Sequence, residues 1–324
     1  MRAAVHTRYG APDVVRICDV EAPVPQANEV LVRIHATTVN RTDCGYRAAK
    51  PFITRFFTGL RRPRVTIMGT EFAGVVEAVG EGVRKFEIGD RVFGYSEGRF
   101  GCHAELLTVP EDGSIASIPA NLTFVEAAPG TEGAHYALSF IRKAKIHEGQ
   151  TVLVNGATGA IGSAAVQLIK GLGAHVTAVC DTAHVGLVSG LGADRVIDYT
   201  SEDFTLDEKQ YDVVLDAVGK STFGRCRRLL KPGGVYSSSE LGRFCQNPVL
   251  ALVTALLPGK SVIFPIPRDN QAIVKQLKDL IESGTFRPVI DRRYRLDQIV
   301  EAYRYVETGQ KIGNVVIEVL DAHP

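Results

Sequence analysis

Cysteine is scarce and scattered in this chain. The 324 residues contain six cysteines, and no two of them form a C-x-x-C pair. This spacing argues against a disulfide framework and against a cysteine-rich zinc lobe. The six are Cys18, Cys44, Cys102, Cys180, Cys226 and Cys245.

The chain also lacks an excess of charge and a long apolar run. A net charge of +1 gives no global attraction to nucleic acid or to an anionic membrane, so neither partner is expected. The most apolar stretch, residues 248–259, is too short to span a bilayer. Residues 1–13 contain no apolar core of a signal peptide. With 45% hydrophobic residues, we expect a cytoplasmic globular enzyme of two domains.

One stretch, TVLVNGATGAIG at residues 151–162, carries a nucleotide-binding pattern. A short apolar run typical of a buried strand leads into a glycine turn, and helical spacing follows. Glycines let the backbone approach phosphates, and the first amides of a helix face negative charge. The pattern departs from strict G-x-G-x-x-G because alanine holds the first glycine position. The predicted dinucleotide-binding residues here are Gly156, Ala157, Thr158, Gly159, Ala160, Ile161 and Gly162.

The rhythm of the chain changes twice. Residues 1–125 contain short β-rich runs divided by glycine and proline, which favours a small antiparallel barrel. Residues 126–284 alternate helix and strand, which indicates βαβ units in one parallel sheet. Residues 285–324 return to strand, helix and strand, and we expect them to rejoin the first domain.

Several motifs resemble the medium-chain dehydrogenase/reductase superfamily, and most closely its zinc-free quinone oxidoreductase-like branch. They are VNRTD, GTEFAGVVEAVGEGV, KFEIGDRVFGY, VNGATGAIGSAAVQ, LGADRVIDY, DVVLDAVG and LLKPGGVY, in that order. The resemblance implies an α/β protein with a GroES-like β-barrel catalytic domain and a Rossmann doubly wound parallel sheet. It also implies an active site in the cleft between the domains, NAD(P)H as the cofactor, and a homodimer.

The resemblance leaves no place for zinc. In the zinc alcohol dehydrogenases the catalytic metal is held by Cys, His and Cys, and the matching positions here are Asn40, Thr70 and approximately Pro129. Zn²⁺ prefers thiolate, imidazole or carboxylate, so we expect no metal. Without a Lewis acid an unactivated alcohol is a poor substrate. A quinone or conjugated enone is better, because hydride adds at carbon while the oxygen becomes a phenolate or enolate.

Three catalytic candidates follow from the matched motifs. The resemblance places Asn40 beside the nicotinamide and substrate, where its amide would bind a carbonyl, although a strand-end cap explains it too. Thr42 matches the hydroxyl that relays a proton in the zinc enzymes, and the alternative is a simple helix cap. Tyr46, one helical turn later, would line the cleft as a phenolic donor or simply pack.

Three further ionisable residues receive weaker roles. Glu71 lies between apolar neighbours, and we expect a structural role for it, with an arginine as its partner. Glu132 and His135 are three residues apart and share a helix face. They could form a proton relay, but a buried pair without a catalytic role is favoured.

The cofactor's identity stays open at this stage. Asp181 comes 19 residues after Gly162, where a carboxylate would accept from the adenosine ribose and favour NADH. The resembling branch mostly uses NADPH, and Thr182, Tyr199, His184 and Arg195 could accommodate its phosphate. Further expected cofactor contacts come from Gly219, Ser238 and Asn314, with Lys311 beside the last of these.

Two segments have no place in a minimal reductase. Residues 50–64 combine phenylalanines with arginines and suggest a lid for an anionic substrate, or a solvated loop. Residues 248–259 suggest an apolar helix that covers the cleft, docks a second subunit or lies in the core.

These observations predict an NAD(P)H-dependent, zinc-free reductase of quinones or α,β-unsaturated carbonyls, acting on a small-molecule substrate. A metal-independent alcohol or aldehyde dehydrogenase-reductase is the second enzyme hypothesis. A non-catalytic, nucleotide-binding redox sensor is the third, because the fold alone does not fix a function.

Overall fold

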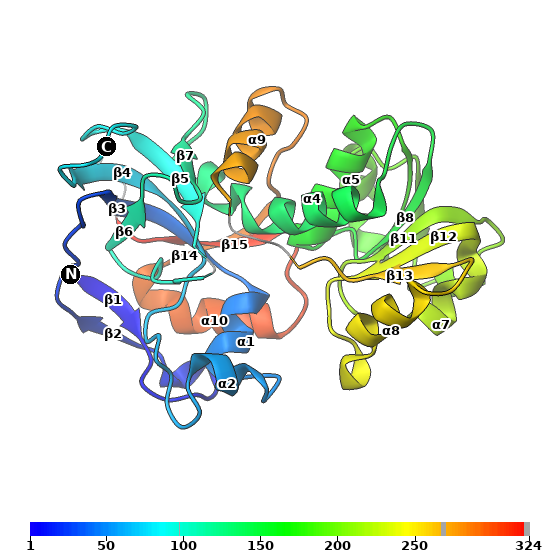
Figure 1. The fold of residues 1–324 in the computed structure, drawn as a ribbon, viewed down its shortest axis with the longest axis horizontal. Coiled ribbons are helices and arrows are strands. Elements are labelled where there is room, and N and C mark those ends of the chain that lie inside the picture. The colour runs from blue at the N-terminus through cyan, green and yellow to red at the C-terminus, as the bar shows by residue number, and fades with distance from the viewer. Residues whose placement is uncertain (97, 267–269, 321–324) are drawn as a thin grey trace. The chain divides into compact units, whose positions relative to one another are not determined.

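The computed structural model describes residues 1–96, 98–266 and 270–320. Its residues form two compact units (Figure 1). Unit 1 comprises Met1–Glu132, Asp269–Ser283 and Pro288–Pro324, and unit 2 comprises Gly133–Arg268 and Gly284–Arg287. Within the described ranges, none of the helices has the length and apolar character needed to cross a bilayer.

Unit 1 is built on a seven-stranded sheet of order β14-β15-β3-β4-β5-β7, with β6 paired to β3. All its strand pairs are antiparallel except β14 with β15. Its strands are β3 (Glu29–Val39), β4 (Glu71–Val79), β5 (Arg91–Tyr95), β6 (Leu106–Pro110), β7 (Ile115–Ser117), β14 (Ile290–Arg295) and β15 (Asn314–Glu318). A separate antiparallel ribbon joins β1 (Arg2–Val5) to β2 (Arg16–Asp19).

The core of unit 1 lies between this sheet and α10. The helix packs against β3, β14 and β15, as Figure 1 shows, and it contributes Ile299, Tyr303 and Val306 to one buried apolar cluster with strand residues. The helices of this unit are α1 (Arg41–Ala48), α2 (Thr54–Thr58), α3 (Phe124–Ala127), α9 (Gln271–Glu282) and α10 (Ile299–Glu307). The C-terminal residues therefore return to the first sheet, because β15 pairs with β3.

Unit 2 is a parallel sheet of order β10-β9-β8-β11-β12-β13. Its strands are β8 (Thr151–Asn155), β9 (His175–Cys180), β10 (Arg195–Asp198), β11 (Tyr211–Asp216), β12 (Leu230–Ser238) and β13 (Ser261–Ile263). Its helices are α4 (Glu132–Ala144, whose first residue belongs to unit 1), α5 (Ala160–Gly171), α6 (Val185–Gly190), α7 (Phe223–Cys226) and α8 (Gln246–Thr254). Figure 1 shows helices on both sides of the sheet, which confirms the doubly wound α/β class.

The order of these strands reverses at β8. The chain crosses from β8 to β9 on one side, whereas β11 pairs with the other side of β8. In open α/β sheets, ligands bind in the crevice at the carboxyl ends of the strands beside such a reversal. The ends of β8 and β11 are therefore the place to look for a nucleotide site.

Two segments differ from simple expectations. Helix α9, which falls within residues 126–284, belongs to unit 1 and packs near β7. Residues 248–259 do not form a core helix, because α8 ends at Thr254 and Leu252 within it, like Leu256 and Leu257 after it, is largely exposed.

Candidate active site

Asn40 joins β3 to α1 and also links two candidate positions. Its side-chain oxygen caps α1 by accepting from the Asp43 amide at 2.9 Å, and the Asp43 carboxylate accepts from the Asn40 amide in return. Its Nδ2 donates to the Thr70 hydroxyl at 2.7 Å. The cap expected as an alternative is therefore present, but it uses only part of the side chain.

The same geometry tests whether zinc fits. The residues at two of the three matched ligand positions, Asn40 and Thr70, are hydrogen-bonded to each other as a neutral amide and a neutral hydroxyl. This donor set does not suit Zn²⁺. In the described parts of the chain, His, Cys, Asp and Glu side chains form no group of three or more that could hold a metal. Zinc does not fit these residues.

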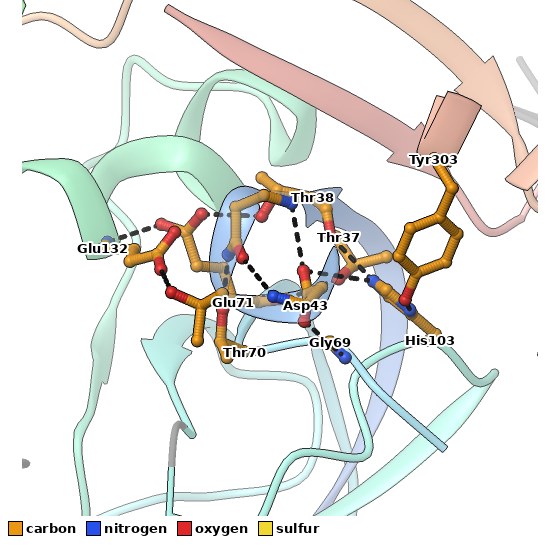
Figure 2. A network of polar contacts seen from close by, with 11 residues as sticks. Thr37, Thr38, Asp43, Gly69, Thr70, Glu71, His103, Glu132 and Tyr303 are labelled. Carbon is orange, nitrogen blue, oxygen red and sulfur yellow. Dashed lines mark hydrogen bonds and ion pairs between the residues drawn. The ribbon is translucent and has the colours of Figure 1, made fainter. Parts of the chain in front are cut away.

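Glu71 is fully buried at the start of β4 and gathers four hydrogen bonds (Figure 2). The hydroxyls of Thr38 and Thr131 donate to it at 2.6 and 2.8 Å, and the Glu132 amide donates at 2.6 Å. Burial raises the pKa of this carboxyl, and these hydrogen bonds oppose part of the rise. Its donors are hydroxyls and backbone amides rather than the arginine expected from the sequence. Glu71 therefore ties β3, β4 and the start of α4 together.

Thr42 and Glu132 meet directly. The Thr42 hydroxyl donates to the Glu132 carboxylate at 2.6 Å, although 90 residues separate them along the chain. Glu132 begins α4 and is only 7% exposed. Burial lowers the pKa of the Lys311 ammonium, and the carboxylates of Glu132 and Glu71 oppose this shift. A half-buried hydroxyl thus connects to a polar network that includes two carboxylates.

The other residues around α4 and α1 have ordinary packing partners. His135 is buried on α4 with its ring 6.2 Å from the ring of Tyr136. Tyr46 lies one turn after Thr42 on α1, and its ring packs on Phe100 at 4.8 Å between centroids.

A buried histidine in unit 1 was missed from the sequence. Nε2 of His103 donates to the Thr38 carbonyl at 2.7 Å, and the Tyr303 hydroxyl lies 3.3 Å from Nδ1 (Figure 2). Burial lowers the pKa of His103 to about 4, so its ring is neutral near pH 7, and the Asp43 carboxylate is 3.8 Å away. These partners are 65 and 200 residues distant, and no local pattern indicates them.

The predicted glycine turn of unit 2 connects β8 to α5. Gly156 follows β8 with φ +79°, and a Cβ there would lie 2.3 Å from Val218 Cγ1. A Cβ on Gly162 would lie 2.1 Å from the Gly156 carbonyl oxygen. Gly159 caps α5, which places the amides of residues 160–162 in the first turn of that helix. Because these amides point out of the helix start, the turn suits a pyrophosphate.

At the carboxyl ends of β9 and β10, the structure places a carboxylate, a hydroxyl and a phenol. Asp181 Oδ1 accepts from the His184 amide at 3.1 Å and lies 2.5 Å from His184 Nδ1. The Thr182 hydroxyl donates to Asp198 at 2.6 Å, and Tyr199 is 57% exposed.

Arg195 lies elsewhere in unit 2. It pairs in register with Thr177 at the amino end of β10, and it binds Asp207 at 2.7 Å. The expectation that Arg195 helps to hold a 2′-phosphate beside Asp181 is therefore wrong, because the two residues sit at opposite ends of neighbouring strands.

Two predicted residues and one missed pair lie at the ends of β8, β11 and β12. Gly219 follows β11 with φ +64°, and Ser238 ends β12 with its hydroxyl accepting from the Glu240 amide at 3.3 Å. Asn155 donates to Asp216 at 3.0 Å between the ends of β8 and β11. This hydrogen bond holds the carboxyl ends of β8 and β11 together beside the point where the strand order reverses.

Asn314 lies in unit 1, and its expected contact with the cofactor stays a prediction. It begins β15 in unit 1, and both its backbone amide and its Nδ2 donate to the Val289 carbonyl, at 2.9 and 3.0 Å. These two hydrogen bonds fix the start of β15, so the side-chain nitrogen of Asn314 has a structural role.

Comparison with known proteins shows the family to which the chain belongs. Residues 26–120 match the alcohol dehydrogenase GroES-like domain, and residues 191–317 match the zinc-binding dehydrogenase model. The chain is 32% identical to 2-methylene-furan-3-one reductase of Solanum lycopersicum and 30% identical to the chloroplastic NADPH-dependent alkenal/one oxidoreductase of Arabidopsis thaliana. Each match covers 98% of this chain and 79% of the relative.

A solved structure agrees with these matches. The quinone oxidoreductase of Coxiella burnetii superposes with a TM-score of 0.88 at 26% identity, covering 99% of both chains. The GroES-like first domain, the parallel sheet with its glycine turn and the sequence matches lead to one assignment: the chain belongs to the medium-chain dehydrogenase/reductase superfamily.

Proposed function

We propose that this protein reduces quinones or α,β-unsaturated carbonyl compounds with NAD(P)H and without a metal ion. The observation that carries the proposal is the Asn40–Thr70 hydrogen bond, which replaces a metal site in a chain that has a complete dinucleotide turn. Its relatives include an alkenal/one oxidoreductase and a reductase of an unsaturated furanone, and a structurally similar protein is a quinone oxidoreductase.

The dinucleotide is held by unit 2 in this proposal. The turn from Gly156 to Gly162 and the first amides of α5 bind its pyrophosphate. Asp181, Thr182 and Tyr199 lie at strand ends where the adenosine ribose is expected, with Gly219 and Ser238 further along the sheet. The bound nicotinamide supplies a hydride.

Unit 1 provides the polar groups for the carbonyl. Asn40 Nδ2 has two hydrogens, and only one is donated to Thr70. We assign the other to the substrate oxygen, which becomes negative when hydride adds to the conjugated system. Because its side-chain oxygen is fixed by Asp43, the amide is already oriented before substrate binds.

Protonation of the reduced product is assigned to Thr42. Glu132, which is hydrogen-bonded to Thr42, first takes a proton from solvent. The Thr42 hydroxyl then gives its proton to the enolate or phenolate and receives the one from Glu132, which returns to the carboxylate form. One hydride and one proton together complete a two-electron reduction. Tyr46 is the second candidate donor, because it lies one turn further along α1.

Steady-state NAD(P)H oxidation with quinones, enones and saturated aldehydes tests the proposal. We expect turnover of the first two classes, and the purified chain should hold well under one zinc per protein with activity unaffected by a chelator. Thr42→Val should lower kcat by about 10²-fold, whereas Thr42→Ser should stay within a few-fold. Stoichiometric zinc, or turnover of saturated aldehydes alone, would overturn this reading.

The proposal includes a two-fold dimer. β13 is an edge strand that pairs only with β12 in the described sheet, and an open edge favours pairing with a second copy. A monomer mass by light scattering at micromolar concentration would contradict the dimer.

A cytoplasmic location stays a prediction from the sequence.

A further inference from the structure

A short surface segment of unit 1, residues 51–64, exposes an unusual number of large apolar side chains. We call it the arginine–phenylalanine segment. It includes α2, and its exposed fractions are 61% for Phe52, 52% for Ile53, 66% for Phe56, 76% for Phe57 and 57% for Leu60. Side chains of this size are normally buried, so their clustering needs an explanation.

The base of this segment is fixed to unit 1. The Tyr9 hydroxyl donates to the Gly59 carbonyl at 2.8 Å and is also hydrogen-bonded to the Thr58 hydroxyl at 2.7 Å. The Arg55 guanidinium lies 4.8 Å from the centre of the Tyr9 ring and 5.3 Å from that of Phe52. Since the backbone is held in this way, the exposed rings stay at the surface instead of folding into the core.

The charged side chains in this stretch of sequence have one sign. Residues 44–70 contain no Asp or Glu, and Arg61, Arg62 and Arg64 are exposed next to the apolar side chains. In the part of the chain that the structure describes, none of these three arginines forms an ion pair. The segment therefore combines exposed apolar side chains with exposed arginines that are unpaired within the described chain.

Protein segments that lie in the interface of a bilayer typically carry phenylalanine and leucine beside arginine. The apolar side chains enter the boundary between headgroups and acyl chains, and the arginines bind lipid phosphates. We propose that the arginine–phenylalanine segment docks this protein on the surface of an anionic lipid bilayer. The near-zero net charge of the whole chain did not predict this, because the attraction is local.

The exposed apolar side chains in α8 and just after it provide a contrast within the molecule. Leu252 in α8 and Leu256 after it are 74% and 87% exposed, but only Arg243 and Lys260 are near them in sequence. This stretch therefore exposes large apolar side chains with fewer cations beside them in sequence. Substitutions there serve as the matched control for surface hydrophobicity.

Flotation of the full chain with vesicles tests the proposal. Wild-type protein should float with phosphatidylcholine vesicles that contain phosphatidylserine, and much less with pure phosphatidylcholine or at high salt. Phe56→Ser/Phe57→Ser should lower the partition coefficient at least tenfold. Arg61→Gln/Arg62→Gln/Arg64→Gln should remove the preference for phosphatidylserine, and Leu252→Ser/Leu256→Ser should keep it.

Two results would overturn the proposal. The wild type could fail to float with anionic vesicles, or the double phenylalanine variant could float as well as the wild type. If, in the second case, the variant also loses kcat/KM for a water-soluble quinone, the segment is a substrate lid. Circular dichroism melting curves would show that each variant is folded.

Discussion

The dinucleotide turn of unit 2 is built from backbone, whereas the candidate catalytic region of unit 1 is built from side chains. In unit 2, the dinucleotide turn depends on backbone shape, since Gly156 and Gly162 leave no room for a Cβ. In unit 1, the candidate catalytic region depends on buried polar side chains, such as Glu71 and His103, that hydrogen-bond across the fold. A backbone site is sensitive to added atoms, whereas a side-chain network is sensitive to lost partners and to pH.

Removing Glu71 should have the largest effect on stability. Glu71→Ala leaves the Thr38 hydroxyl and the amides of Thr131 and Glu132 buried without their acceptor. At about 1–3 kcal/mol for each unpaired donor, the three donors set a range of about 3–9 kcal/mol. Because water can enter the space left by the side chain, we expect the free energy of unfolding to fall by about 3–5 kcal/mol, the lower part of that range. Glu71→Gln keeps one oxygen acceptor and should cost about half as much. Denaturant unfolding followed by circular dichroism measures both, and a loss below about 1 kcal/mol in Glu71→Ala would refute the network's importance.

The same network should make stability depend on pH through His103. Its folded pKa of about 4 is below the usual 6.5, so between these values the unfolded chain binds a proton that the folded chain does not. Stability is therefore lost as pH falls from about 6.5 towards 4. His103→Gln has no imidazole at this position, so its stability does not fall with pH for this reason. The difference in unfolding free energy between wild type and His103→Gln should therefore shrink by about 2–3 kcal/mol from pH 7 to pH 4.5. His6, whose pKa burial also lowers, remains in both proteins and cancels. A deficit that is constant with pH would contradict the buried, neutral histidine.

The backbone site should instead respond to one added methyl group. Gly162→Ala places a Cβ against the Gly156 carbonyl oxygen, so we expect a loss of about 1–3 kcal/mol in unfolding free energy and weaker NADPH binding. Gly186→Ala on α6 is the matched change, because nothing lies within 4 Å of its Cβ. That variant should be neutral or slightly stabilised, by about 0.5–1 kcal/mol. Equal behaviour of the two variants in calorimetry and in a NADPH titration would remove the distinction.

The smallest predicted effect concerns cofactor choice. Asp181→Ser removes a carboxylate expected to face the adenosine ribose and releases His184 from its pair. The kcat/KM ratio should move towards NADPH by at least tenfold, which corresponds to about 1.4 kcal/mol. Asp194→Ser removes the same charge next to the amino end of β10 and should leave the ratio unchanged. An unchanged ratio in Asp181→Ser would mean that this carboxylate does not face the ribose.

The contrast between the sites also explains what the sequence could predict. The strand, glycine turn and helix at residues 151–171 are local features, and the alternation of strands and helices indicated the parallel sheet. The partner of Thr42 lies 90 residues away and those of Glu71 lie 33 to 61 residues away, and a single sequence carries no signal for such pairs. Asn40 was found because a motif marks it, whereas His103 belongs to no motif. Arg195 was misplaced because its strand's direction was not considered.

The most direct test of the central claim follows the hydrogens into the product. The enzyme would reduce cyclohex-2-enone with NADPH deuterated at the transferred position, and separately with unlabelled NADPH in D₂O. Mass spectrometry and NMR would then locate the deuterium. The account predicts cofactor deuterium on the carbon β to the carbonyl and solvent deuterium on the α carbon, with the ketone intact. Cofactor deuterium on the carbonyl carbon, with an alcohol as the product, would contradict it.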